Sequence, residues 1–104
     1  MHFSVVTVLL PLLAATPLAS AWKLQVFMND GRSVTTHGRL DSGCKTYDFD
    51  MSSPVKRVKF ENSLVTKSFE LYTKRGCQGA VSYRNNEGTY DLTPPRKILS
   101  YKAY

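Results

Sequence analysis

The sequence has few of the residues that catalytic and metal sites need. After residue 21 it contains a single histidine, His37, and only two cysteines, Cys44 and Cys77. One histidine without a nucleophile-elbow motif excludes a Ser-His-Asp set. The two cysteines are better used in a disulfide bond than as zinc ligands. We therefore predict a protein that is not an enzyme, with no cofactor and no metal site.

The sequence also lacks a hydrophobic run long enough to span a membrane comfortably. The apolar run from Val5 to Ala15 is shorter than the roughly 20 residues that cross a bilayer, and Pro11 interrupts it. A small-residue cleavage pattern follows at residues 19–21. We predict a signal peptide over residues 1–21, a single domain over residues 22–104, and an extracellular, secreted protein. The alternative is a membrane anchor with Trp22 at the interface.

The two cysteines are expected to pair. Secreted domains of this size have a small core and often depend on a disulfide. A Cys44–Cys77 bond would close a loop of 33 positions, which the chain-entropy model values at roughly 3.5–4 kcal/mol. Two buried free thiols or an intermolecular bond are the alternatives.

Helical periodicity is absent after residue 21, and short runs rich in Val, Thr, Tyr and Phe alternate with turn residues. Leu24 and Val26 share one face of the first run, and Asp30-Gly31 is a favoured hairpin pair. We expect strands at 23–27, 32–36, 45–49, 55–60, 69–73 and 98–103, with turns at 29–31, 41–43, 76–79 and 85–88 and a further strand between the last two turns.

The two halves of the chain repeat each other. Residues 46–49 (TYDF) recur as residues 89–92 (TYDL) at an offset of 43, and residues 26–27 match residues 71–72 at an offset of 45. Each half has about four strands with one apolar face, which two packed sheets can bury. We predict an all-β fold, an antiparallel β-sandwich of two Greek-key-like halves with a single disulfide. Chance similarity between strand-like segments is the alternative.

The second half carries Tyr72, Cys77 and Gly79 at the spacing of a folded hairpin and ends in the strand-like ILSYKA. This arrangement resembles the Greek-key motif of the βγ-crystallin superfamily, with Cys77 in place of an aromatic residue. In the first half, Phe27 is followed by Arg32 and Val34, which do not fit. The resemblance covers residues 69–103 better than residues 23–60.

Small secreted proteins of filamentous fungi and killer-toxin-like proteins look similar, which implies an effector or virulence role. Residues 95–100 and 52–57 stand where some members of that superfamily bind calcium, but their clustered cations disfavour that ion. The MAX effectors offer a rival fold, although Cys44 lies later than the first cysteine of that group.

Lys and Arg outnumber Asp and Glu by 14 to 8, and all of them follow residue 21. We expect two basic edges and a basic hairpin, which together form a candidate binding surface. Its members are Lys56, Arg57, Lys59, Lys74, Arg75, Arg96, Lys97 and Lys102. One interpretation is that these charges serve only solubility and protection of edge strands. Alternatively, they bind an anionic partner, with Tyr83, Tyr101 and Tyr104 available for stacking.

These features predict a monomeric, secreted, non-enzymatic binding protein of the fungal effector or virulence-associated type. Its partner would be a host protein or an anionic surface, such as a membrane, cell wall or nucleic acid, and no small-molecule substrate is expected. An antimicrobial, killer-toxin-like protein that acts on membranes or cell walls is the alternative. A small ribonuclease would need His37, Glu61 and Arg57 to converge.

Overall fold

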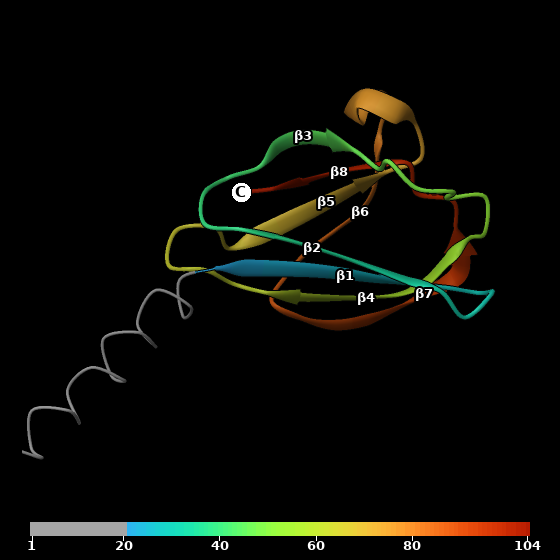
Figure 1. The fold of residues 1–104 in the computed structure, drawn as a ribbon, viewed down its shortest axis with the longest axis horizontal. Coiled ribbons are helices and arrows are strands. Elements are labelled where there is room, and N and C mark those ends of the chain that lie inside the picture. Colours follow the sequence, from blue (N-terminus) through green and yellow to red (C-terminus); the bar gives the residue numbers. More distant parts are fainter. Residues whose placement is uncertain (1–20) are drawn as a thin grey trace, which may run out of the picture.

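The computed structural model describes residues 21–104, which form two antiparallel sheets and no α-helix (Figure 1). The predicted signal peptide lies outside the described residues, except for Ala21. The elements are β1 (Trp22–Met28), β2 (Ser33–Gly38), β3 (Gly43–Thr46), β4 (Val55–Glu61), β5 (Ser68–Tyr72), the 3-10 turn η1 (Arg75–Cys77), β6 (Val81–Asn86), β7 (Gly88–Arg96) and β8 (Ser100–Ala103).

All of the expected strands are present, but their bounds differ by up to three residues, and two of these differences have a clear structural reason. The strand expected at residues 45–49 ends at Thr46, after which Tyr47 turns into the core and Phe49 is left 64% exposed. The strand expected at residues 98–103 begins at Ser100, because residues 97–99 carry the chain from one sheet to the other.

The two sheets contain strands from both halves of the chain. Sheet A has the order β2-β1-β4-β7 and sheet B has the order β3-β8-β5-β6. Each half therefore keeps three strands together and contributes its third strand, β3 or β7, to the opposite sheet. Replacing every strand by its counterpart in the other half converts one order into the other. The predicted sandwich of two Greek-key-like halves is confirmed.

The strand registers test the sequence repeat residue by residue. Val26 lies opposite Val58 in sheet A, and Leu71 lies opposite Tyr101 in sheet B, which agrees with the expected offsets. In the third strands, however, Tyr90 lies opposite Val58 and Lys45 lies opposite Tyr101. The structural counterpart of Tyr90 is thus Lys45, two residues before the tyrosine that the sequence match suggested.

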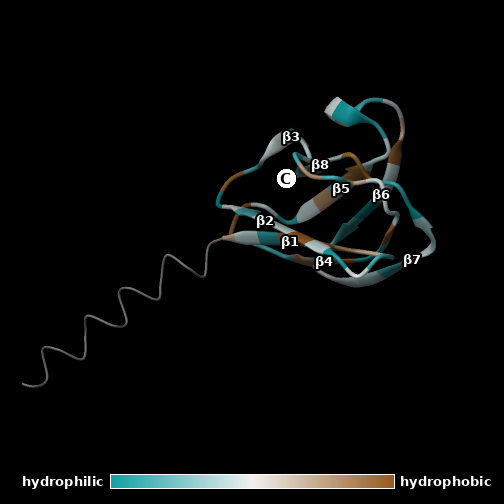
Figure 2. Ribbon diagram, turned by 45° about the vertical axis from the view of Figure 1, so that its right-hand side comes forward, coloured by the Kyte–Doolittle hydropathy of each residue, from teal (hydrophilic) through white to brown (hydrophobic). Residues whose placement is uncertain are grey.

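The core lies between the inner faces of the two sheets. In sheet A, alternate residues of β1 are buried, and β4 contributes Val55, Val58 and Phe60. In sheet B, Phe69 and Leu71 are fully buried. Figure 2 shows the corresponding alternation of hydrophobic and hydrophilic segments along the strands. The rings of Phe60 and Phe69 meet across the interface with centroids 5.1 Å apart. Trp22 covers one end of the core, where its Nε1 donates to the carbonyl of Leu40 at 2.8 Å.

The predicted disulfide is present. Cys44 in β3 is bonded to Cys77 in η1, with their Cα atoms 5.9 Å apart. The bond joins the two halves of the sequence, yet both of its ends belong to one side of the sandwich. It fixes the edge strand β3 to the hairpin between β5 and β6, which projects above sheet B (Figure 1).

Candidate functional site

Four of the predicted basic residues lie on the middle strands of the two sheets and not on edge strands. Lys56, Arg57 and Lys59 belong to β4, which lies between β1 and β7. Lys102 belongs to β8, which lies between β3 and β5. The prediction of two basic edges is therefore wrong, because the crossovers place both strands in the middle of their sheets. Protection of edge strands cannot explain the cations of β4 and β8.

Two cations of β4 have acidic neighbours on the outer face of sheet A. Arg57 Nε lies 2.7 Å from Asp91 Oδ1, and Lys59 Nζ lies 3.7 Å from Glu61 Oε2. All four side chains are about half exposed or more. Such exposed pairs add little stability, but they balance the local charge. Arg57 and Lys59 therefore contribute less to an anion-binding surface than the sequence suggested.

Arg96 has a structural contact and does not project into solvent. It is half-buried, donates a hydrogen bond to the carbonyl of Ser82, and lies over the ring of Tyr83 at 5.7 Å from the centroid. Tyr101 is only 7% exposed, and Tyr104 donates a hydrogen bond to Glu70. The three tyrosines expected to stack with a ligand do not form one platform.

Of the five remaining predicted cations, all but Lys102 lie at one end of the sandwich. Val55 at the start of β4 lies opposite Arg96, so Lys56 and Lys97 both flank that pair. The hydroxyl of Ser100 donates to the carbonyl of Lys74, which brings η1 to the same end. We call Lys56, Lys74, Arg75 and Lys97 the basic end. All four are exposed, and none forms an ion pair within residues 21–104.

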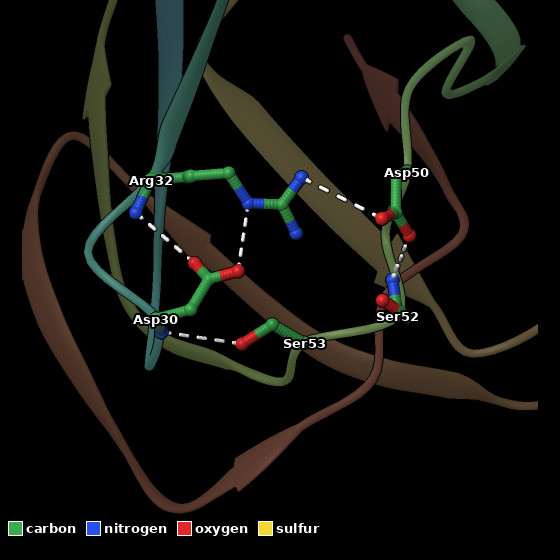
Figure 3. A network of polar contacts seen from close by, with 5 residues as sticks. All are labelled: Asp30, Arg32, Asp50, Ser52 and Ser53. Atoms are coloured by element: carbon green, nitrogen blue, oxygen red, sulfur yellow. Dashed lines mark hydrogen bonds and ion pairs between the residues drawn. The ribbon is translucent and has the colours of Figure 1, made fainter.

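A polar network next to the basic end ties two loops together (Figure 3). The Arg32 guanidinium lies 2.7 Å from Asp30 and 3.9 Å from Asp50, and its backbone N–H donates to Asp30 at 3.1 Å. Ser53 Oγ accepts from the backbone N–H of Asp30 at 3.3 Å, and the N–H of Ser52 donates to Asp50 at 3.1 Å. The turn between β1 and β2 is thereby fixed to the loop between β3 and β4.

The same contacts keep the two carboxylates near the basic end ionised, with one guanidinium between them. The backbone hydrogen bond from Arg32 lowers the pKa of Asp30, and hydrogen bonding to Ser52 lowers the pKa of Asp50. The sequence predicted the turn at residues 29–31. An Asp two residues before an Arg in a turn is also a sequence signal for the contact between Asp30 and Arg32. The pairing with Asp50, 18 residues later, depends on the fold.

The outer face of sheet B carries a second cluster, around Glu70, which the sequence analysis missed. Its carboxylate accepts from the hydroxyl of Tyr72 at 2.5 Å, the hydroxyl of Tyr104 at 2.8 Å and Nε of Arg84 at 2.9 Å. The Glu70 side chain is 10% exposed, although it lies on the outer face of the sheet. We call these four residues the Glu70 cluster.

Two groups of the Glu70 cluster, Glu70 and Tyr72, have shifted pKa values. Burial raises the pKa of Glu70, but hydrogen bonds from Tyr72, Tyr104 and Arg84 outweigh it, so the pKa lies below its usual value. The hydrogen bond to Glu70 raises the pKa of Tyr72 to about 12. A carboxylate held ionised by three side chains is a poor general base. The cluster therefore fits a structural clamp better than a catalytic group.

A pocket of about 420 Å³ adjoins this cluster and is lined by Asp41, Gly43, Glu70, Lys102, Ala103 and Tyr104. Lys102 is half-buried there, beside the Asp41 and Glu70 carboxylates. Lys102 therefore has acidic neighbours on the outer face of sheet B, and we do not count it as part of the basic end.

The residues of the hypothetical ribonuclease site do not converge. His37 and Glu61 both lie opposite Lys23, on either side of β1, so two strand spacings of about 10 Å in total separate their backbones. Arg57 contacts Asp91 instead. Within residues 21–104, no group of three or more His, Cys, Asp and Glu could hold a metal ion.

Comparisons with known proteins returned no match among family models, curated proteins or solved structures. In the part of the chain that the structure describes, no helix is long and apolar enough to cross a membrane.

Proposed function

We propose that this is a secreted, non-enzymatic binding protein of the fungal effector or virulence-associated type, which engages an anionic partner through its basic end. The observation that carries the proposal is the convergence of three chain segments there. The start of β4, the η1 hairpin and the loop before β8 bring together Lys56, Lys74, Arg75 and Lys97. Clustered, unpaired cations raise the local concentration of an anionic partner and speed its association.

The scaffold is consistent with this proposal. The Cys44–Cys77 bond suits an oxidising compartment and holds the η1 hairpin in place beside β3. We also propose that the protein is related to βγ-crystallin-like and killer-toxin-like proteins. It is supported by the two Greek-key halves and by the position of Tyr72, Cys77 and Gly79 around the hairpin.

Binding is favoured over a reaction because the titratable groups are either engaged or isolated. The Glu70 carboxylate is surrounded by donors, and His37 is exposed on β2 with Lys23 between it and Glu61. The protein recognises its partner through charge and not through stacking on bases, because Tyr83 lies under Arg96 and Tyr101 is buried. An acidic protein surface or a cell-surface polyanion fits this chemistry better than a single-stranded nucleic acid.

The test compares two double charge reversals with the same net charge. K56E/K97E alters the basic end, and K23E/R39E alters two exposed cations at the opposite end. Binding of the oxidised protein to heparin and to phosphatidylserine vesicles is measured as a function of salt. Near an anionic surface each cation contributes about 1 kcal/mol, so K56E/K97E should weaken binding roughly thirty-fold or more.

K23E/R39E should weaken binding much less. Equal losses in the two variants would show that only net charge matters, and the proposal would fail. Vesicle leakage or growth inhibition of microbes that depends on Lys56 and Lys97 would instead favour the antimicrobial alternative.

A further inference from the structure

Four strands lie at the sheet edges within residues 21–104, and three of them are protected. β7 contains Pro94 and Pro95, β3 has only four residues, and the carbonyl of Ser82 on β6 accepts a hydrogen bond from Arg96. β2 is the exception, with six residues that include no Lys, Arg, Asp, Glu or Pro. A long, uncharged edge strand presents unpaired backbone groups to other chains.

The register identifies which backbone groups of β2 are free. The N–H of Met28 donates to the carbonyl of Arg32, so hydrogen-bonded pairs between β1 and β2 continue at every second residue. Val34 and Thr36 therefore bond to β1. The N–H and C=O groups of Ser33, Thr35 and His37 point away from β1, and β2 has no other neighbouring strand in the described part of the chain.

A pocket of about 340 Å³ lies directly beside this free edge. It is lined by Met28, Arg32, Ser33, Val34, Thr35 and Phe49. Phe49 comes from the loop between β3 and β4 and is 64% exposed, which is unusual for so large an apolar side chain. Arg32, held between Asp30 and Asp50, links the edge to that loop (Figure 3). The pocket thus opens between the end of sheet A and a fixed loop.

We propose that β2 accepts an extended segment of a partner protein as a fifth strand of sheet A, with a large apolar side chain of that segment seated in the pocket. Main-chain hydrogen bonds to Thr35 and His37 would supply affinity, and the pocket would supply selectivity. A second copy of this chain fits less well. The β2 strand of a second copy has only Val34 and Thr36 on its inward face. Val34 is already buried in the core of that copy, so it is not available to fill the pocket. The inference does not rest on the basic end.

The first measurement is amide hydrogen exchange. In the free protein, the amides of Thr35 and His37 should exchange much faster than those of Val34 and Thr36, which bond to β1. A displayed library of random dodecapeptides is then selected on the oxidised protein. An enriched peptide should contain a Leu, Met or Phe in an extended context, and it should slow exchange at Thr35 and His37.

Three variants separate the backbone from the side chains. Thr35→Pro removes one outward donor at an edge position, where proline is tolerated, and Thr35→Ala removes the same side chain but keeps the donor. Thr35→Pro and Phe49→Ser should each weaken the selected peptides about tenfold, and Thr35→Ala should leave binding within about twofold. Heparin binding should be unchanged in all three, so a failure of this inference differs from a failure of the basic end.

Several results would overturn the proposal. One such result is a peptide library in which no sequence is enriched. Another is a set of selected peptides that bind Thr35→Pro and Phe49→Ser as tightly as the unmodified protein. The third is amide hydrogen exchange at β2 that does not change when a selected peptide is added. A dimer in sedimentation that is lost in Thr35→Pro would assign the edge to a second copy instead. If Thr35→Pro does not fold, the exposed Phe49 variant and the exchange measurement still decide the question.

Discussion

Replacing Glu70 with Gln tests whether the outer face of sheet B is held by one carboxylate. Gln keeps the shape but loses the charge. Its single oxygen can accept from Arg84 and Tyr104, and its NH₂ group then donates to the Tyr72 hydroxyl, which has to turn its own proton away. Hydrogen bonds to a charged group contribute about 1.5–3 kcal/mol. Arg84 is 61% exposed and can return to water, whereas Tyr72 is buried. We therefore expect Glu70→Gln to lower the free energy of unfolding by about 2–3 kcal/mol.

The assay is urea unfolding at neutral pH, with Glu61→Gln as the control. Glu61 makes one exposed ion pair, at 3.7 Å from Lys59, so its loss should change stability by less than about 0.5 kcal/mol. Equal effects of the two substitutions would refute the reasoning, because they would show that the enclosed carboxylate contributes no more than an exposed one.

The pH dependence of stability follows from the same cluster. The pKa of Glu70 is lower in the folded protein, so its stabilisation is present above the unfolded value and is lost as pH falls through the folded pKa. The pKa of Tyr72 is raised from 10.0 to about 12, so its stabilisation is full below pH 10 and is lost as pH rises towards 12. Glu70→Gln should reduce the loss of stability both at low pH and at high pH. If the pH dependence of the unfolding free energy is unchanged in that variant, other groups are responsible for it.

Two further substitutions test the scaffold. Cys44→Ser/Cys77→Ser should lose about 3.5–4 kcal/mol of unfolding free energy, since the closed loop spans 33 positions, and urea unfolding that matches the oxidised protein would contradict a stabilising bond. Phe60→Ala should cost about 3–5 kcal/mol because Phe60 is 1% exposed and packs on Phe69, whereas Phe49→Ala should change stability by less than about 0.5 kcal/mol. A large cost at Phe49 would place that ring in the core.

The features predicted correctly from the sequence are those that short segments or composition determine. Leu24 and Val26 alternate with polar residues, so their strand and its buried face follow from a period of two. Cys44 and Cys77 are the only cysteines, so their pairing required only an oxidising compartment. The repeat gave the correct offsets for the first and last strands of each half.

The features that were missed depend on crossovers between sheets. Nothing in the residues of β4 shows that β7, from the other half of the chain, pairs beside it and makes it central. Glu70 meets Tyr104 only because β5 and β8 are neighbours, 34 residues apart in sequence. The match between Tyr47 and Tyr90 was misleading, because Tyr47 has already left β3 and entered the core. Local patterns predict strands, but they do not determine strand order.

The exchange of third strands is the central feature of the fold, since it makes β4 and β8 the middle strands of their sheets and places β3 beside β8. The most direct test is a nuclear Overhauser measurement between α-protons of the oxidised protein. Cys44 lies opposite Lys102 in sheet B, in a pair where the backbones approach closely, so their α-protons should give a strong cross-peak. Cross-peaks from Cys44 to residues of β2 would instead show a local hairpin and contradict the exchange.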